Sequence, residues 1–403
     1  MLFMDDISVM LCDDSALMRN LIGRIVDDTV GFKVIGKAEN GLDLLEKLKT
    51  LSPDVILLDI EMPKMTGVQF LEKRRELKID IPVIVLSSIA VEGANVTMKC
   101  LELGASDFIT KPGGSSISIN IADVSGQIIE CISSYGGDYA KKKGRKIYEP
   151  DFFNHQIKLK ESNRLLQKKR GEDLSKVPPL SKNDIETLAA WKPLVSKKPV
   201  TITPARDGGR IEIIAIGIST GGPNALREMF KDLDPNLKQP ILVVQHMPAG
   251  FTAEFAESLN HICPIPVSEA KDGEVIMNHH IYIAPGNYHM YVVHRPIGNA
   301  IKLSQDEQRN GHRPSVDVLF ESIAANYENR ALGVIMTGMG RDGAAQLAEM
   351  RKKGAWTLGQ DQASSIVYGM PKVAFELGAV QKQVPLSKMA QEVNQLASEH
   401  LYR

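Results

Sequence analysis

The sequence is poor in cysteine, in aromatic residues and in net charge. Its 403 residues include 4 cysteines and 2 tryptophans, aromatic residues make up 5%, and the formal net charge at pH 7 is −1. The cysteines show neither a CxxC spacing nor the density of a disulfide framework, which argues against structural zinc and favours a reducing compartment. A charge balance this close to zero gives no reason to expect nucleic acid or an anionic membrane surface as a partner.

Long apolar runs are also missing. No run approaches the roughly 18 residues of a transmembrane helix, so we expect no direct membrane insertion. The first residues, MLFMDDISVMLCDD, carry acidic side chains early and no basic region before the apolar stretch. This argues against a signal peptide and favours a cytoplasmic protein. The chain is 43% apolar and 24% charged, and it is long enough for two or three domains, each with its own core.

Residues 5–125 alternate short aliphatic runs with amphipathic segments. The expected strands are Ile7–Cys12, Lys33–Ala38, Val55–Asp59, Val83–Ser87 and Asp107–Thr110. The expected helices between them are Ala16–Asp28, Gly41–Leu48, Gly67–Leu77 and Val96–Leu103. This alternation predicts an α/β domain in which helices cover both faces of a parallel sheet, with five strands in a flavodoxin-like order.

Acidic residues follow two of these strands. Asp13 and Asp14 come after the first strand and Asp59 ends the third, so we expect the three carboxylates to be neighbours. Three neighbouring carboxylates repel one another unless a cation binds between them. Mg²⁺ suits such a site because it prefers ligands that are all oxygen. Ser87 and Lys111, at the ends of the fourth and fifth strands, could bind oxygens of a phosphoryl group on Asp59. The alternative is a set of capping acids beside a solvated lysine.

Between the regular segments lies a stretch without clear periodicity. Residues 126–210 are interpreted as a largely irregular, charged linker, with basic clusters, acids and several prolines. Asn183–Trp191 could form a short helix, and Trp191 could dock onto a domain. The alternative is a solvated tether along the whole segment.

Residues 211–403 resume the alternation of strands and helices. The expected strands are Ile211–Ile216, Ile241–Gln245, His280–Ala284 and Ala331–Met336. The expected helices are Asn224–Asp232, Thr252–His261, Val316–Tyr327 and Gly343–Lys353. We therefore expect a second domain with a doubly wound, mostly parallel α/β sheet.

Within this second domain, the segment IEIIAIGISTGG is typical of a nucleophile on a sharp turn. The apolar run is expected to break at Gly217 and to present Ser219 just before a helix, whose N-terminus favours developing negative charge. Gly217, Gly221 and Gly222 would let a substrate carbonyl approach the backbone. A dinucleotide loop is a poor alternative, because Ser219 stands where the second glycine of G-x-G-x-x-G belongs.

Two further strand ends supply the partners of a catalytic triad. His246 follows the second strand of this domain and could accept the Ser219 proton, while Asp342 could orient the imidazole. The backbone N–H of Thr220, together with that of Met339 or Gly340, is a candidate for an oxyanion hole. Each residue alone has an ordinary interpretation, as a turn serine, a structural histidine or a helix-capping aspartate. The combination of three complementary groups favours a serine hydrolase.

Several other residues have simpler interpretations. The histidines at 279, 280, 289 and 294 match no metal-ligand spacing and are expected to be structural. Ser315 is interpreted as a helix cap, and Arg313 could meet an acidic substrate helix. A non-enzymatic, phosphorylation-dependent adaptor and a hydrolase with another target stay open as functional alternatives.

Residues 5–125 resemble response-regulator receiver domains. The residues that carry the resemblance are Asp13, Asp14, Asp59 within LLDIEMPKMTG, Ser87, Phe108 and the Lys111–Pro112 pair. The resemblance implies phosphorylation at Asp59, with Ser87, Phe108 and Lys111 as phosphoryl-binding and switch residues. It also implies Mg²⁺ held by Asp14, Asp59 and the backbone carbonyl of Glu61, with Asp13 acting through water.

Residues 211–395 resemble the catalytic domain of the chemotaxis methylesterase (CheB) family. The motifs are GISTGGPNAL, VVQHMPAGFT, YIAPGNYHM, HRPSVDVLF and TGMGRDGA. The resemblance implies a Ser219–His246–Asp342 triad that hydrolyses glutamate methyl esters, and deamidates glutamines, on methyl-accepting chemoreceptors. It implies the histidine kinase CheA as phosphodonor, and relief of inhibition by receiver phosphorylation. The linker is longer than the short tether expected for the family.

Overall fold

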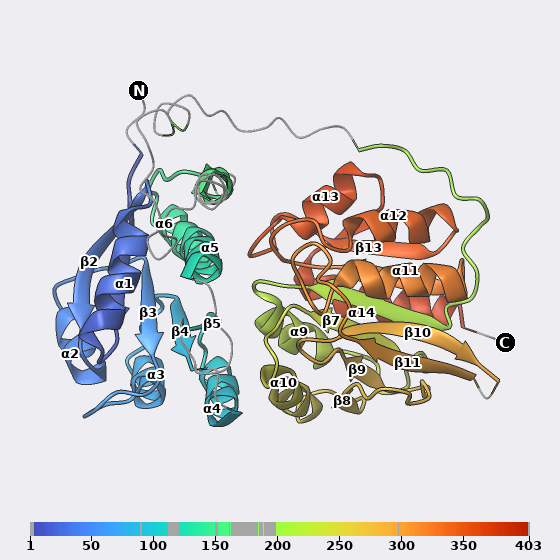
Figure 1. Cartoon of the computed structure of the whole chain (residues 1–403), viewed down its shortest axis with the longest axis horizontal. Helices are drawn as coiled ribbons and strands as arrows, with labels where there is room; N and C mark the ends of the chain where they lie inside the picture. Colours follow the sequence, from blue (N-terminus) through green and yellow to red (C-terminus); the bar gives the residue numbers. More distant parts are fainter. Residues whose placement is uncertain are drawn as a thin grey trace. The chain divides into compact units, whose positions relative to one another are not determined.

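The computed structural model describes residues 4–88, 91–111, 121–149, 152–160, 162, 184, 188, 199–296 and 298–401 (Figure 1). The chain divides into two compact units, Met1–Val195 and Ser196–Arg403. Each has its own parallel sheet with helices packed on it, as the alternation in the sequence predicts.

The first unit is built on a five-stranded sheet in the order β2-β1-β3-β4-β5, with every neighbouring pair parallel. The strands are β1 (Ile7–Cys12), β2 (Phe32–Ala38), β3 (Val55–Asp59), β4 (Val83–Ser87) and β5 (Asp107–Thr110). The helices are α1 (Ala16–Asp27), α2 (Gly41–Lys47), α3 (Gly67–Glu76), α4 (Val91–Glu102) and α5 (Ile121–Cys131). α1 packs against α5, while α2, α3 and α4 pack in a row. The flavodoxin-like order is confirmed.

Local sequence explains where these helices begin. Ser15 and Asn40 each accept a hydrogen bond from a backbone N–H of the helix that follows. Thr66 and Gln69 form a capping box at the start of α3. These side chains satisfy N–H groups that the first turn of a helix leaves unpaired. The loops that carry the acidic residues therefore end at well-defined positions.

The regular structure of this unit extends well beyond residue 125, which corrects the predicted linker. After α5 the chain forms the π-helical segment η1 (Ile132–Gly136) and α6 (Gly137–Lys142), and residues 152–160 are helical. The Phe153 ring is fully buried and stacks on Phe32 at 4.5 Å between centroids. Gln156 is also fully buried, and its amide pairs with both the N–H and the C=O of Val30. Sparse apolar residues among many charges anchor this segment on the sheet.

The other prediction for this segment, a helix at Asn183–Trp191 with Trp191 docked onto a domain, lies outside the described residues except at positions 184 and 188. Both of those positions are helical.

The second unit has a seven-stranded parallel sheet in the order β14-β13-β12-β6-β7-β9-β8. Its strands are β6 (Ile213–Ile218), β7 (Ile241–Gln245), β8 (Val267–Glu269), β9 (Ile281–Ile283), β12 (Ala331–Ile335), β13 (Trp356–Gln360) and β14 (Lys382–Val384). An antiparallel pair, β10 (His289–Arg295) and β11 (Gly298–Ser304), stands apart from it. The four predicted strands correspond to β6, β7, β9 and β12.

The helices of this unit form two groups. They are α9 (Gly222–Phe230), α10 (Phe251–Asn260), α11 (Val316–Tyr327), α12 (Ala344–Lys352), α13 (Met370–Glu376) and α14 (Leu386–Glu399). α11, α12 and α13 pack together, and α9 packs against α10 and α14. The core cluster joins side chains of β6 and β7 to α11 and α12, so these elements hold the loops at the strand ends.

Gly217 does not end the strand that leads to the candidate nucleophile, contrary to the sequence prediction. β6 continues to Ile218, and Gly217 pairs with Val244 on one side and Ile335 on the other. A Cβ at position 217 would lie 2.2 Å from Cγ1 of Val316, so the glycine permits close packing of α11 on β6.

In the described part of the chain, no helix is long and apolar enough to cross a membrane.

We predict that Phe153→Ala destabilises the first unit. Removing this fully buried ring leaves a cavity against Phe32, a change that costs about 3 kcal/mol of unfolding free energy. Hydrogen exchange at the amides of β1 and β2 measures the loss, with β6 as an internal reference. Leu77→Ala, at a side chain 54% exposed, is the control and should change little. Equal protection in the two variants would contradict a structural role for residues 152–160.

Candidate functional sites

Ser219 lies in the tight connection between β6 and α9, as the sequence predicts. Its N–H donates to the carbonyl of Thr337 at 2.9 Å, which ties this turn to the loop that follows β12. Gly221 has φ +78°, a left-handed conformation that lets the chain enter α9 at once. A Cβ on Gly338 would lie 2.5 Å from Cβ of Ser219, so the two loops are in close contact.

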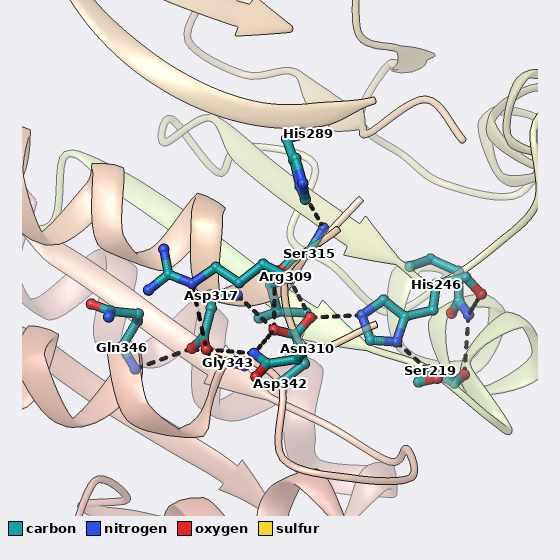
Figure 2. A network of polar contacts seen from close by, with 12 residues as sticks. Ser219, His246, His289, Arg309, Asn310, Ser315, Asp317, Asp342, Gly343 and Gln346 are labelled. Atoms are coloured by element: carbon teal, nitrogen blue, oxygen red, sulfur yellow. Dashed lines mark hydrogen bonds and ion pairs between the residues drawn. The ribbon is translucent and has the colours of Figure 1, made fainter. Parts of the chain in front are cut away.

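His246 and Asp342 complete a hydrogen-bonded chain with Ser219 (Figure 2). His246 follows β7; its Nδ1 lies 3.1 Å from Oγ of Ser219, and its Nε2 lies 2.8 Å from Oδ2 of Asp342. In the catalytically useful tautomer Nε2–H donates to the carboxylate and Nδ1 accepts from the hydroxyl. The two nitrogens thus exchange the roles they have in chymotrypsin-like triads, while the chemistry is unchanged.

The Asp342 carboxylate is almost fully buried and surrounded by donors. Its Oδ1 accepts from Nδ2 of Asn310 and Oγ of Ser315, both at 2.8 Å, and from the N–H of Asp317 at 3.1 Å. Its Oδ2 accepts from the N–H of Val316 at 2.7 Å in addition to His246. Burial alone would raise the pKa of Asp342, but the donors, His246 foremost, hold it well below its usual range.

Asp342 caps a helix other than its own. α12 begins after Gly343, and Asp342 instead accepts the first N–H groups of α11. Asp317, in the first turn of α11, accepts in return from the N–H groups of Gly343 and Gln346 at the start of α12. Ser315 stands at the N-cap position of α11, but its side chain donates to Asp342, which corrects its interpretation as a capping side chain. The two helices are thus capped reciprocally.

His312 is a site residue that the sequence interpretation missed. Its ring stacks on the ring of His246, with centroids 3.8 Å apart and an interplanar angle of 11°. Burial, and then the neighbouring His246, lower the pKa of His312 to about 3, so it stays neutral at physiological pH. It offers a flat, uncharged surface against one face of the His246 imidazole. Its position just before the Arg-Pro-Ser segment that enters α11 was the available signal.

Gln245 was also missed. Its Nε2 donates to the carbonyls of Ser219 at 3.1 Å and His246 at 3.0 Å, so one buried amide joins the loop of Ser219 to the loop of His246. A Cβ on Gly222 would lie 1.9 Å from Oε1 of Gln245. Gly222 therefore makes room for this amide rather than for a substrate carbonyl.

The candidate oxyanion donors lie in the two loops that meet at Ser219. Among the residues that the structure describes, neither the N–H of Thr220 nor that of Met339 donates to a protein acceptor. Met339 follows Gly338, which packs against Ser219. Both N–H groups are therefore available for a ligand.

Arg313 and His289 serve the protein scaffold. The Arg313 guanidinium donates to Oδ1 of Asn287 and to the carbonyls of Gln305 and Asp306. His289 accepts from the N–H of Ser315 at 3.2 Å and faces the Glu307 carbonyl at 3.0 Å. Within the described part of the chain, the group with metal-binding geometry is the acidic one, and it contains no histidine.

In the first unit, three carboxylates gather where β1 and β3 end. Candidate ligand oxygens of Asp13, Asp14 and Asp59 all lie within 4.8 Å of one another. Nζ of Lys111 is 2.7 Å from Oδ1 of Asp59 and 2.9 Å from Oδ2 of Asp13. Asp13 and Asp59 are buried, whereas Asp14 is exposed. A set of oxygen ligands with more negative than positive charge fits Mg²⁺.

The charge on Asp59 is incompletely compensated. Burial raises the pKa of Asp59 to about 6; the Lys111 ammonium opposes this shift, and the Asp13 carboxylate adds to it. The N–H of Glu61 approaches Oδ1 of Asp59 at 3.4 Å, which places the Glu61 backbone beside the cluster. Arg19, which the sequence interpretation missed, donates to the carbonyls of Asp13 and Asp14 and holds their loop.

Ser87 and Phe108 lie on the neighbouring strands. Ser87 is fully buried, and its Oγ is 2.7 Å from Oγ1 of Thr97 on α4. Thr97 in turn donates to the carbonyl of Gly93 at 2.6 Å, which leaves its oxygen as an acceptor for the Ser87 hydroxyl. The Ser88 carbonyl, 3.1 Å from Oγ of Ser87, is a second acceptor for the same hydrogen. Phe108 on β5 is half-buried. The Ser87 hydroxyl is thus already engaged by α4 in this structure.

We predict that Asp59→Asn stabilises the first unit at neutral pH when divalent cations are chelated. The folded-state pKa of about 6 lies above the unfolded-state value of about 4, so stability falls as the pH rises through this window. Removing the charge should therefore add up to about 3 kcal/mol above pH 6 and little below pH 4. Urea unfolding at pH 4.5 and 7.5 measures the difference, with exposed Asp14→Asn as the control. An equal gain at both pH values would contradict the account.

Comparison with known proteins places this geometry in a family. Residues 214–393 match the family model for CheB methylesterase, and residues 9–119 match that for the response regulator receiver domain. The protein-glutamate methylesterase/protein-glutamine glutaminase of Treponema pallidum (strain Nichols) is 49% identical over 403 residues, covering 97% of each chain. The protein of the same name from Treponema denticola is 49% identical and covers 98% of this chain and 100% of its own.

A solved structure also matches. The crystal structure of the Thermotoga maritima CheB methylesterase catalytic domain is 34% identical, covers 47% of this chain and 98% of its own, and has a TM-score of 0.45. The family itself follows from the matches along the whole chain. This chain belongs to the protein-glutamate methylesterase/protein-glutamine glutaminase family, with a response regulator receiver domain followed by a CheB methylesterase domain.

Proposed function

We propose that this protein is a phosphorylation-regulated methylesterase that hydrolyses glutamate methyl esters, and deamidates glutamines, on the cytoplasmic parts of methyl-accepting chemoreceptors. The observation that carries the proposal is the continuous hydrogen-bonded chain from Ser219 through His246 to Asp342. The name of its relatives, protein-glutamate methylesterase/protein-glutamine glutaminase, supplies the reaction class, since the triad geometry serves any carboxyl ester or amide.

Catalysis begins with attack of Ser219 Oγ on the side-chain carbonyl of the substrate. Nδ1 of His246 takes the hydroxyl proton, and Asp342 stabilises the imidazolium that forms. The N–H groups of Thr220 and Met339 receive the oxyanion. His246 returns the proton to the leaving group, so methanol departs from an ester and ammonia from an amide. Water, activated by His246, then hydrolyses the acyl-enzyme and frees Ser219.

The first unit regulates this reaction through Asp59. A histidine kinase of the CheA type supplies the phosphoryl group, which is transferred to a carboxylate oxygen of Asp59. Asp14, Asp59 and the Glu61 carbonyl would hold Mg²⁺, which neutralises charge on the transferring group. Lys111 and Ser87 then bind phosphoryl oxygens. Phosphorylation shifts the population from an inhibited to an active arrangement of the two domains.

The helical residues 126–142 and 152–160 belong to the receiver domain in this proposal, so the tether is shorter than residues 126–210. The catalytic domain covers residues 211–403. A shorter tether raises the effective concentration of the receiver domain at the catalytic domain and strengthens the inhibited state.

We predict that Ser219→Ala abolishes methanol release from methylated receptor membranes, with a loss of more than about a thousandfold. Ser304→Ala, which removes a hydroxyl of β11, should keep full activity. Adding Mg²⁺ and a small phosphodonor should stimulate the wild type but not Asp59→Asn, which keeps the basal release. Wild-type protein that becomes phosphorylated at Asp59 yet releases no methanol would favour the adaptor or another target.

A second prediction concerns Thr97, because its hydroxyl competes with a phosphoryl group for Ser87. Thr97→Val removes the nearer of the two acceptors and leaves the Ser88 carbonyl at 3.1 Å. A hydrogen bond worth about 1 kcal/mol corresponds to roughly fivefold in the switching equilibrium. The phosphodonor concentration for half-maximal methanol release should fall by that factor. In a Ser87→Ala background the same substitution should have no effect. Equal effects in the two backgrounds would contradict competition for Ser87.

A further inference from the structure

A tight two-residue turn stands beside the triad. The N–H and C=O groups of Arg309 and His312 pair with each other, at 3.1 and 3.0 Å. Asn310 and Gly311 between them have φ +55° and +81°. Two consecutive left-handed residues are the signature of the type I′ turn that Asn-Gly favours. The turn holds His312 against the ring of His246 and directs the side chain of Asn310 toward the acids.

The amide of Asn310 lies between two buried carboxylates (Figure 2). Its Nδ2 is 2.6 Å from Oδ2 of Asp317 and 2.8 Å from Oδ1 of Asp342. Asp342 and Asp317 are 1% and 6% exposed, so solvent screens their repulsion poorly. Burial raises the pKa of Asp317, the Asn310 hydrogen bond opposes this shift, and the charge on Asp342 adds to it. Two hydrogens on one nitrogen are the minimum set that can serve both acids at once.

We propose that Asn310 is a positioning residue of the esterase, whose single amide bridges Asp317 and Asp342 and so keeps Asp342 ionised and aimed at Nε2 of His246. The proposal rests on the proposed function only for the identity of the reaction. The Ser315 hydroxyl and two backbone N–H groups also donate to Asp342. None of these three donors is hydrogen-bonded to the Asp317 carboxylate as well. The bridging position is what distinguishes Asn310 from them.

The consequence of losing the Asn310 amide follows from the negative charges of Asp317 and Asp342. The groups that face Asp342 are His246 after β7, His312 and Asn310 in the turn, and Asp317 on α11, which Arg309 approaches at 4.0 Å. Without the amide, the unshielded Asp317 makes the potential at the triad more negative. The triad as a whole then binds a proton more readily, and the acid limb of its pH–rate profile moves to higher pH.

The test uses Asn310→Gly in the full-length protein, because glycine keeps the left-handed turn while removing the amide. Two readouts are recorded against pH: methanol release from methylated receptors, and covalent labelling of Ser219 by a fluorophosphonate. The second readout needs no receptor, so failure of the proposed substrate is distinguishable from failure of the positioning role. We expect labelling to slow about tenfold at neutral pH, and its acid limb to rise by about half a unit to one unit.

Asp317→Asn supplies the decisive comparison. In the wild-type background this substitution replaces the carboxylate that accepts from Asn310 by a second amide, so the two amides compete for Asp342 and labelling should slow. Combined with Asn310→Gly it places a new amide beside Asp342, because both acids contact the same nitrogen in the wild type, and should restore both the rate and the acid limb. In a Ser315→Ala background, which removes a donor that does not bridge, Asp317→Asn should restore neither.

Thermal unfolding of each variant identifies losses that come from stability. An Asn310→Gly protein that folds and keeps the wild-type labelling rate and acid limb would overturn the proposal. So would a double variant no faster than Asn310→Gly alone, because the role of Asn310 would then be structural rather than electrostatic.

Discussion

The catalytic domain depends on one buried carboxylate. Asp342 accepts hydrogen bonds from His246, from the side chains of Asn310 and Ser315 and from the first N–H groups of α11. Because these donors come from the loop after β7, from the Arg309–His312 turn and from a helix N-terminus, a single charge joins elements far apart in sequence. Removing it would leave several buried donors unpaired as well as a misdirected imidazole. Asp342 therefore both holds these elements together and orients the His246 imidazole.

The two units treat a buried aspartate in opposite ways. Around Asp342 burial is outweighed by several hydrogen-bond donors, so the pKa of this carboxyl falls and the group is ionised at neutral pH. Around Asp59 burial, aided by the Asp13 carboxylate, outweighs Lys111, so the pKa of Asp59 rises to about 6 and its negative charge is incompletely compensated. The first arrangement suits a fixed electrostatic partner for an imidazolium. The second suits a residue that gains stability when a cation or a phosphoryl group arrives.

Sequence patterns were sufficient to locate the candidate residues that directly follow a buried strand. Ser219 and His246 each come just after an aliphatic run, and the same pattern places Asp13 and Asp59 together. The pattern could not identify Asn310 or His312, because their roles depend on a turn whose partners lie far along the chain. The Asn-Gly dipeptide was a usable signal for that turn. Nor did periodicity reveal the helices after residue 125, where a few apolar side chains such as Phe153 are spread among charges. The reciprocal capping of α11 and α12 depends on contacts between residues far apart in sequence, so a short stretch of sequence does not reveal it.

The central claim is that Asp342, through His246, activates Ser219 as a nucleophile. The most direct measurement is the rate at which a fluorophosphonate labels the full-length protein, with the modified residue located by peptide mass spectrometry, in wild type and in Asp342→Asn. The account predicts a single adduct on Ser219 and a loss of at least about a thousandfold in the variant, because the asparagine disfavours the required imidazole tautomer. Labelling at another residue, or equal rates in the two proteins, would contradict it.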